Sequence, residues 1–217
     1  MSLTEMVIMP GEDYQKLCDN LRTALRWYQP ICSNEAAGMI VGLCDERDTI
    51  ESVVTGTIQG EYYNANITTL RAYAFAYAKK ITKVRLPQLT SAGGYAFTNC
   101  TGLVRAEFPF FQAGGTTALF GTCTELKHVD LGQVDSLTTN TFLNCSKLES
   151  VVLRRSSVSA LSNINAFSNT PFANGGAGGK IYVPKALIET YKTATNWSVL
   201  HGYGTCEFVA IEGSEFE

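Results

Sequence analysis

The chain has 217 residues, 45% of them hydrophobic, which suffices for one domain with a substantial core. Its 17 basic and 20 acidic residues leave a net charge of -3, so there is no global positive field to attract nucleic acid. The longest apolar run, residues 36–44, is far shorter than the roughly 20 residues of a membrane-spanning helix. We therefore expect neither nucleic-acid binding nor membrane insertion.

Residues 1–47 are predicted to form a short helical hairpin. The first helix begins after Pro10, and its apolar residues share one helical face: Tyr14, Leu17, Cys18, Leu21 and Leu25. Pro30 ends this helix, and Ser33 is placed to cap a second one. Such a hairpin either caps the first unit of the domain that follows or attaches the chain to a partner, including a second copy in a homo-oligomer.

Residues 48–217 are predicted to form a leucine-rich-repeat solenoid. A loosely alternating segment, residues 48–66, leads into the repeats as one or two strands. Five phenylalanines then recur at intervals of 22, 23, 22 and 25 residues: Phe75, Phe97, Phe120, Phe142 and Phe167. In the first four units the third, sixth, ninth and eleventh residues after the phenylalanine are small or apolar. A period in the low twenties is the length of one leucine-rich-repeat coil, so these columns are expected to stack as a core.

Each unit is expected to contain one short strand. The apolar positions six, nine and eleven form the pattern Leu-x-x-Val-x-Leu, and residues 126–131 are its cleanest copy. The eighth and tenth residues then point outward as two columns on one face: Lys83, Arg105, His128 and Ser150, and beside them Arg85, Glu107, Asp130 and Val152.

These eight side chains are the candidate binding site. Adjacent rows are about 5 Å apart, so Arg105 can reach Glu107 or Asp130. The face is therefore either paired internally or free to contact a ligand, and solenoids do use such faces for binding.

A C-terminal cap is predicted from about residue 180. Residues 180–183 are expected to form a strand, and Pro184 occupies the first position of a helix that continues to Trp197. Residues 208–211 can add a closing strand.

The sequence offers no catalytic, metal-binding or cofactor-binding motif. Its two histidines, His128 and His201, have no neighbouring nucleophile and carboxylate, and the seven cysteines include no Cys-x-x-Cys pair. Three cysteines stand in the third-residue column, where parallel side chains are poorly oriented for disulfide bonds. We expect free, buried thiols at Cys100, Cys123 and Cys145, and a protein that is not an enzyme.

The repeat region resembles the BspA-like subfamily of leucine-rich repeats. The similarity lies in the segments Ala96–Cys100 and Phe142–Leu148, in the strand pattern followed by proline, and in the closing stretch from Ile181 to Ser198. It covers about residues 67–200 and implies the solenoid fold. Residues 11–22 are similar to the N-terminus of phage and prophage tail-associated proteins from gut bacteria, which implies a virion-associated location.

Two functions are compatible with these features. The leading hypothesis is a non-catalytic recognition or adhesion module that binds a protein or glycan surface, as a phage tail accessory protein or at a cell surface. The alternative is a structural assembly or spacer protein with no ligand of its own. Residues 1–6 lack both a basic leader and a sufficient apolar stretch, so we expect no secretory signal peptide.

Overall fold

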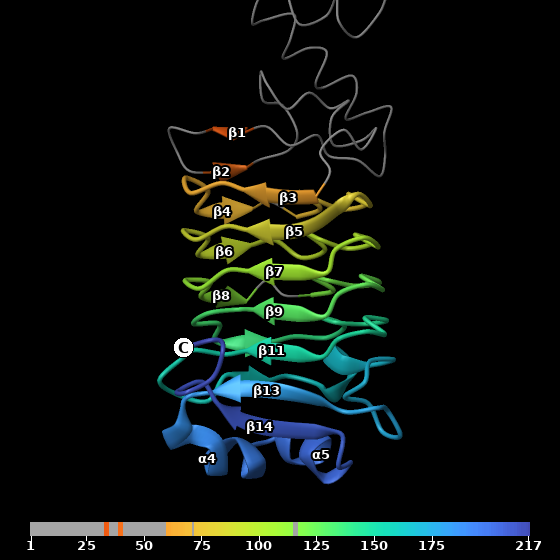
Figure 1. Cartoon of the computed structure of the whole chain (residues 1–217), viewed down its shortest axis with the longest axis vertical. Helices are drawn as coiled ribbons and strands as arrows, with labels where there is room; N and C mark the ends of the chain where they lie inside the picture. Colours follow the sequence, from red (N-terminus) through yellow and green to blue (C-terminus); the bar gives the residue numbers. More distant parts are fainter. Residues whose placement is uncertain (1–32, 35–38, 41–59, 71, 115–116) are drawn as a thin grey trace, which may run out of the picture.

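The computed structural model describes residues 33–34, 39–40, 60–70, 72–114 and 117–217. Successive coils stack along the long axis of the molecule, and each contributes one strand to a seven-stranded main sheet (Figure 1). The neighbouring strands of this sheet are parallel. In chain order they are β3 (Gly60–Tyr63), β5 (Ile81–Arg85), β7 (Arg105–Glu107), β9 (His128–Asp130), β11 (Ser150–Val152), β13 (Gly179–Val183) and β14 (Cys206–Ala210). The solenoid prediction is confirmed.

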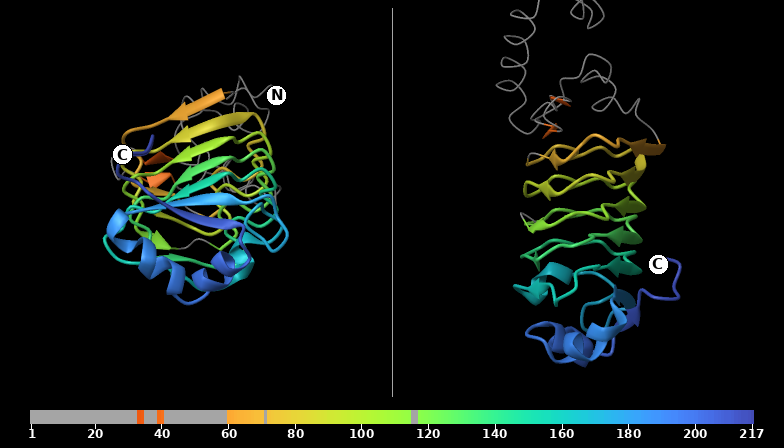
Figure 2. Two further views of the ribbon diagram at one scale, coloured as in Figure 1. Left: turned by 60° about the horizontal axis from the view of Figure 1, so that its bottom comes forward. Right: turned by 90° about the vertical axis from the view of Figure 1, so that its left-hand side faces the viewer.

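A second row of very short strands runs along another side of the coils (Figure 2). Its members, each two residues long, are β4 (Thr69–Leu70), β6 (Ser91–Ala92), β8 (Ala113–Gly114), β10 (Ser136–Leu137) and β12 (Ala160–Leu161). Each of these strands lies between the main-sheet strand of its coil and the next phenylalanine, so a coil contains a second short strand where the sequence predicted only one. Backbone pairing between equivalent positions of successive coils joins β4, β6 and β8 in one sheet, and β10 and β12 in a separate pair.

The structure describes four residues of the predicted N-terminal hairpin. Ser33–Asn34 (β1) and Met39–Ile40 (β2) form an antiparallel strand pair, and β2 pairs in parallel with β4. The prediction of a second helix beginning at Ser33 is therefore wrong at Ser33–Asn34 and Met39–Ile40, because the backbone groups of β2 pair with the open edge of the first coil. The first predicted helix lies outside the described residues.

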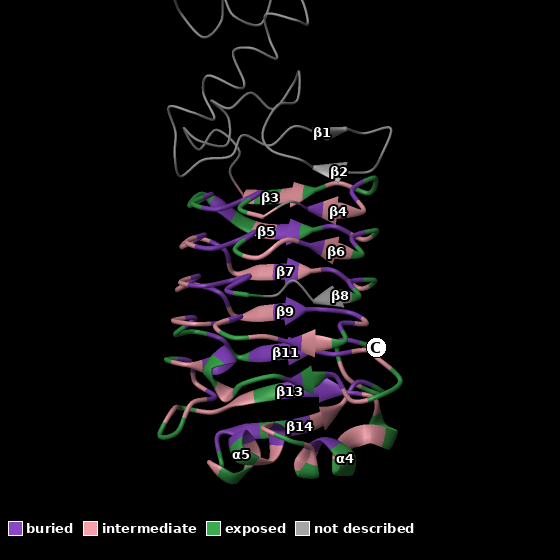
Figure 3. Ribbon diagram, turned by 180° about the vertical axis from the view of Figure 1, so that it is seen from behind, coloured by how far each residue is buried: buried purple, intermediate pink, exposed green. Residues whose placement is uncertain are grey.

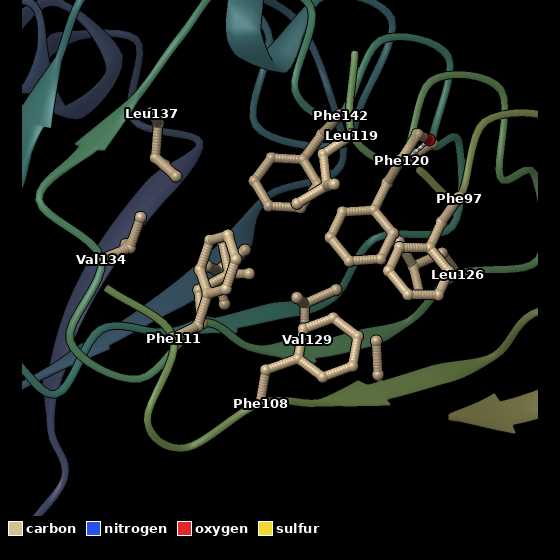
Figure 4. Close-up of a cluster of buried hydrophobic side chains, with 14 of the residues drawn as sticks. Phe97, Phe108, Phe111, Leu119, Phe120, Leu126, Val129, Val134, Leu137 and Phe142 are labelled. Atoms are coloured by element: carbon tan, nitrogen blue, oxygen red, sulfur yellow. Dashed lines mark hydrogen bonds between the residues drawn. The ribbon is translucent and has the colours of Figure 1, made fainter. Parts of the chain in front are cut away.

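The phenylalanine ladder is the centre of the core. Consecutive rings from Phe75 to Phe142 are stacked, with centroids 5.1, 5.4 and 5.7 Å apart, and Phe167 continues the row at 5.2 Å with a tilted ring. The five rings are fully or almost fully buried, and Figure 4 shows three of them pointing into the same interior space. Each coil thus buries its apolar side against its neighbours.

The cysteine column is confirmed as a row of free, buried thiols. Cys100, Cys123 and Cys145 each donate a hydrogen bond from Sγ to a phenylalanine carbonyl of the preceding coil, at 2.9, 3.0 and 3.1 Å. Burial raises the pKa of Cys145 to about 12, so this thiol stays protonated. The small polarizable side chain fills its place in the core and also satisfies a backbone carbonyl.

The C-terminal cap contains two short α-helices instead of the single helix expected. After β13, a 3-10 turn (η3, Lys185–Leu187) leads into α4 (Ile188–Thr193) and α5 (Trp197–Gly202). The chain breaks between them because Ala194 is extended and Asn196 has a left-handed φ of 64°. Buried Trp197 donates from its indole nitrogen to the Ser159 carbonyl at 2.8 Å, which fixes the cap on the last coil, next to the 3-10 turn η2 (Ile164–Phe167).

Candidate functional site

The two predicted outward columns lie side by side on the outer face of the main sheet. Strands β5, β7, β9 and β11 pair so that Lys83, Arg105, His128 and Ser150 fall in one row. Their neighbours two residues later form the second row: Arg85, Glu107, Asp130 and Val152. The predicted register is confirmed, because the same offset from each phenylalanine places these residues at equivalent points of successive coils.

The columns extend beyond the eight predicted residues at both ends. Glu61 and Tyr63 of β3 precede them, and Lys180, Tyr182, Glu207 and Val209 of β13 and β14 follow. Sequence reasoning missed the later rows because Lys180 lies thirteen residues after Phe167, whereas Ser150 lies eight after Phe142. The glycine-rich segment 175–179 supplies the extra length, and only the strand pairing reveals the equivalence.

Glu107 is the centre of an ion-pair network at the β3 end of the face. Its two carboxylate oxygens accept from Arg105 Nε and Arg85 Nε, both at 2.6 Å. Lys83 Nζ lies 3.5 Å from Glu107 and 3.7 Å from Glu61. Burial alone would raise the pKa of Glu107, but the hydrogen bond and charge of Arg105, together with the charges of Lys83 and Arg85, hold this pKa below its ordinary value. This half of the face is therefore paired internally.

The cations of this network are more exposed than the carboxylate that joins them. The side chains of Arg85 and Arg105 are 48% and 34% exposed, against 20% for Glu107. A partner approaching the face therefore meets guanidinium groups first.

Asp130 does not pair with Arg105 as the sequence allowed. Its carboxylate accepts from Arg154 Nε at 2.9 Å and from the Gly132 amide at 2.9 Å, and the residue is buried. Arg154 was not among the predicted site residues. It stands two residues after the end of β11, where Pro87 and Pro109 stand after β5 and β7, and an exchange of proline for arginine in that column is the signal that could have found it.

His128 occupies the middle of the face and is partly buried. Its Nδ1 lies 2.8 Å from the Ser150 hydroxyl, and its Nε2 lies 3.8 Å from the Glu149 carboxylate. Burial lowers the pKa of His128 from 6.5, against the opposing charge of Glu149. The imidazole is therefore neutral near pH 7 and forms a hydrogen bond with the Ser150 hydroxyl.

The β11 end of the face is apolar and covered, which corrects the prediction of one open surface. Residues 211–217, which we call the C-terminal segment, turn back after β14 and lie outside the main sheet (Figure 2). Val152 and Tyr182 pack there against Ile211 and Phe216. Figure 3 shows the resulting contrast, since β11 is buried throughout whereas β7 is only partly so. Val152 is therefore fully buried under this cover, whereas Ser150 is buried with its hydroxyl bonded to His128 and lies outside the apolar cluster.

Two grooves flank the C-terminal segment. One, of about 210 Å³, is lined by the arginine side chains of the ion-pair network and by residues 215–217. The other, of about 660 Å³, lies toward β13 and β14 and is lined by side chains that include His201, Cys206, Glu149 and Glu207.

The larger groove brings together a histidine, a thiol and carboxylates, the combination that would favour enzymatic chemistry. Burial raises the pKa of the Cys206 thiol to about 12, so it is protonated and a poor nucleophile at neutral pH. His201 Nδ1 lies 3.2 Å from the Cys206 backbone carbonyl. This arrangement does not activate the thiol.

Two further observations concern metal binding and membrane insertion. Among the described residues, no three His, Cys, Asp or Glu side chains are placed to hold a metal ion together. No helix in the described part of the chain is long and apolar enough to cross a bilayer.

The repeats match a known family model. The BspA type leucine rich repeat region matches residues 62–175 in 6 copies, which is more than half of the chain. The chain belongs to the BspA-type leucine-rich-repeat family. A leucine rich cell surface protein from Faecalibacterium prausnitzii A2-165 aligns with 24% identity and a TM-score of 0.43, over 50% of this chain and 28% of its own. No curated protein matches the chain at a significant level.

The BspA-type repeats and the segment after them build different halves of the outer face. Strands β5, β7, β9 and β11 lie within residues 62–175 and carry the charged columns. Strands β13 and β14 and the C-terminal segment follow the family match and supply the larger groove and the apolar cover. The residues that follow the family match therefore determine which part of the outer face is accessible.

Proposed function

We propose that the chain is a non-catalytic recognition or adhesion module that contacts a protein or glycan surface through the outer face of the main sheet. The observation that carries this proposal is the cluster of partly exposed cations, Lys83, Arg85 and Arg105, held in a fixed array by Glu107. Fixed charges lose little conformational entropy on binding, which favours recognition of a complementary surface. BspA-type repeats support a solenoid face of this kind.

A finer proposal concerns the location of the protein. We propose a cell surface or a virion, and the expectation of a phage or prophage tail accessory protein rests on residues 11–22, to which the family match does not extend. These residues lie outside the described part of the structure. Neighbouring genes that encode tail or holin proteins would support the virion, whereas their absence would favour the cell surface.

Charge reversal tests the recognition face. We expect the double variant Lys83→Glu/Arg85→Glu to lose most binding to whole bacterial cells or to an immobilised glycan array, measured with fluorescently labelled protein. The control variant Lys147→Glu/Lys192→Glu changes the net charge equally, and its two lysines pair with Glu125 and Glu189 away from the columns. We expect it to bind as the unaltered chain does.

Circular dichroism and thermal unfolding must show that both variants are folded. Equal binding by the two variants would remove the charged columns as the contact surface. If the unaltered chain binds neither cells nor glycans, the result supports the alternative of a structural spacer.

A further inference from the structure

The last part of the C-terminal segment, residues 213–217, is attached to the outer face mainly through one side chain. The beginning of the segment is fixed, since the Ile211 amide donates to the Val183 carbonyl at 3.0 Å and the Lys185 amide donates to Glu212 Oε2 at 2.9 Å. After Glu212, the hydrogen bonds that the structure gives close within the segment itself, such as Phe216 N to Ser214 Oγ at 3.1 Å. Residues 213–217 therefore hold to the sheet by the packing of Phe216.

Phe216 occupies a place on the sheet shaped for an aromatic ring. Its ring meets the edge of Tyr182, with centroids 4.6 Å apart, and packs on Val152. The guanidinium of Arg105 lies 5.7 Å from the ring centroid, within the range of a cation–π interaction. Phe216 is almost fully buried although it lies near the end of the chain.

The groove beside this ring favours negative charge. It is lined by Arg85, Arg105 and Arg154 and also by their less exposed partners Glu107 and Asp130, so the sheet contributes one cation in excess. Glu215 and Glu217 also line the groove, one on each side of Phe216. The segment Glu-Phe-Glu thus places an aromatic ring on the sheet and two carboxylates at a groove that arginines line, with Glu217 Oε2 accepting from the Gly213 amide.

We propose that this part of the face binds an acidic peptide with an aromatic residue, presented by a partner protein, and that residues 213–217 occupy the site when the partner is absent. The proposal rests on the recognition function above and names the chemistry of its ligand. The intramolecular segment lowers the apparent affinity of the site by the fraction of time that it stays bound. Releasing Phe216 opens the site while the fixed part of the segment, up to Glu212, stays in place.

Fluorescence anisotropy tests the proposal with a labelled peptide, Gly-Ser-Glu-Phe-Glu, which reproduces residues 213–217. We expect Phe216→Ala in the full chain to bind this peptide at least about 10-fold more tightly than the unaltered chain, because the competing ring is gone. The matched peptides Gly-Ser-Glu-Ala-Glu and Gly-Ser-Lys-Phe-Lys should bind at least about 10-fold more weakly than the original, since each lacks one recognised feature. Adding Arg105→Gln to Phe216→Ala should weaken binding likewise.

Several outcomes would overturn the proposal. A folded Phe216→Ala protein that binds the peptide no better than the unaltered chain shows that the segment is only a structural cover. Equal binding of the lysine peptide shows that the groove has no preference for acidic ligands.

Two further outcomes separate this inference from the proposed function. If the Phe216→Ala protein does not bind the peptide, while Lys83→Glu/Arg85→Glu still abolishes cell or glycan binding, only this inference is wrong. If the peptide binds but neither cells nor glycans do, the inference stands, and the proposed contact with a cell or glycan surface fails.

Discussion

Glu107 shows how a single side chain can organise a surface. It receives hydrogen bonds from Arg85 and Arg105 and lies 3.5 Å from Lys83, so three cations share one carboxylate. The carboxylate sits on β7, which also carries Arg105, and the neighbouring strand β5 carries Lys83 and Arg85. Removal of the carboxylate would leave Arg105 without this partner, and Lys83 and Arg85 with only their longer contacts to Glu61.

Glu107→Gln is therefore expected to destabilise the protein by about 1–2 kcal/mol at pH 7, measured by urea denaturation. Because the folded-state pKa is lowered, the stability from Glu107 is complete above its ordinary value of 4.5 and is lost as the pH falls through the lower folded-state pKa. The variant should accordingly show a shallower loss of stability in acid. The control Glu125→Gln removes an exposed pair with Lys147 and should cost less than about 0.5 kcal/mol. Equal costs for both variants would contradict the network.

At the scale of the elements, each coil is stable only between its neighbours. Phe120 illustrates this dependence, since its ring stacks on Phe97 on one side and on Phe142 on the other. The short strands on the two sides of a coil contribute few backbone hydrogen bonds by themselves. Packing between coils therefore supplies most of the stability of each unit.

Phe120→Ala is expected to lower the free energy of unfolding by about 3–5 kcal/mol, because it opens a cavity in the middle of the ladder. Chemical denaturation monitored by circular dichroism measures the change. Phe110→Ala is the matched control: this ring is 53% exposed, so its loss should cost less than about 0.5 kcal/mol. A loss below about 1 kcal/mol at Phe120 would show that the coils do not depend on the ladder.

At the scale of the whole molecule, the two ends of the solenoid are closed in different ways. The C-terminal end is covered by α4 and α5, whose buried residues include Tyr191 and Trp197. At the other end, β2 pairs with β4 and extends the row of short strands. The sequence left open a homo-oligomer formed through residues 1–47 at this end of the solenoid, and we propose that contact here.

Deletion of residues 1–47 tests this proposal. We expect the shortened chain to have a lower oligomeric state in sedimentation velocity than the full chain, while Lys83 and Arg85 still support cell or glycan binding. Retained oligomers after the deletion would place the contact elsewhere. A monomeric full chain would remove the homo-oligomer proposal.

The repeat pattern determined the coil, the inward columns and the register of the charged residues. This was possible because identical offsets from each phenylalanine place residues such as Lys83 and Arg105 at equivalent points of stacked coils. The sequence also indicated the free thiols, since Cys100, Cys123 and Cys145 share one column.

Only the tertiary structure decided which part of the face is open. The glycine-rich segment shifts Lys180 and Tyr182 out of the repeat count, so their place in the columns depends on strand pairing. The C-terminal segment then covers Val152 because apolar side chains far apart in the sequence meet there. The repeat pattern in the sequence does not predict such contacts, because they form only when the C-terminal segment folds back over the sheet.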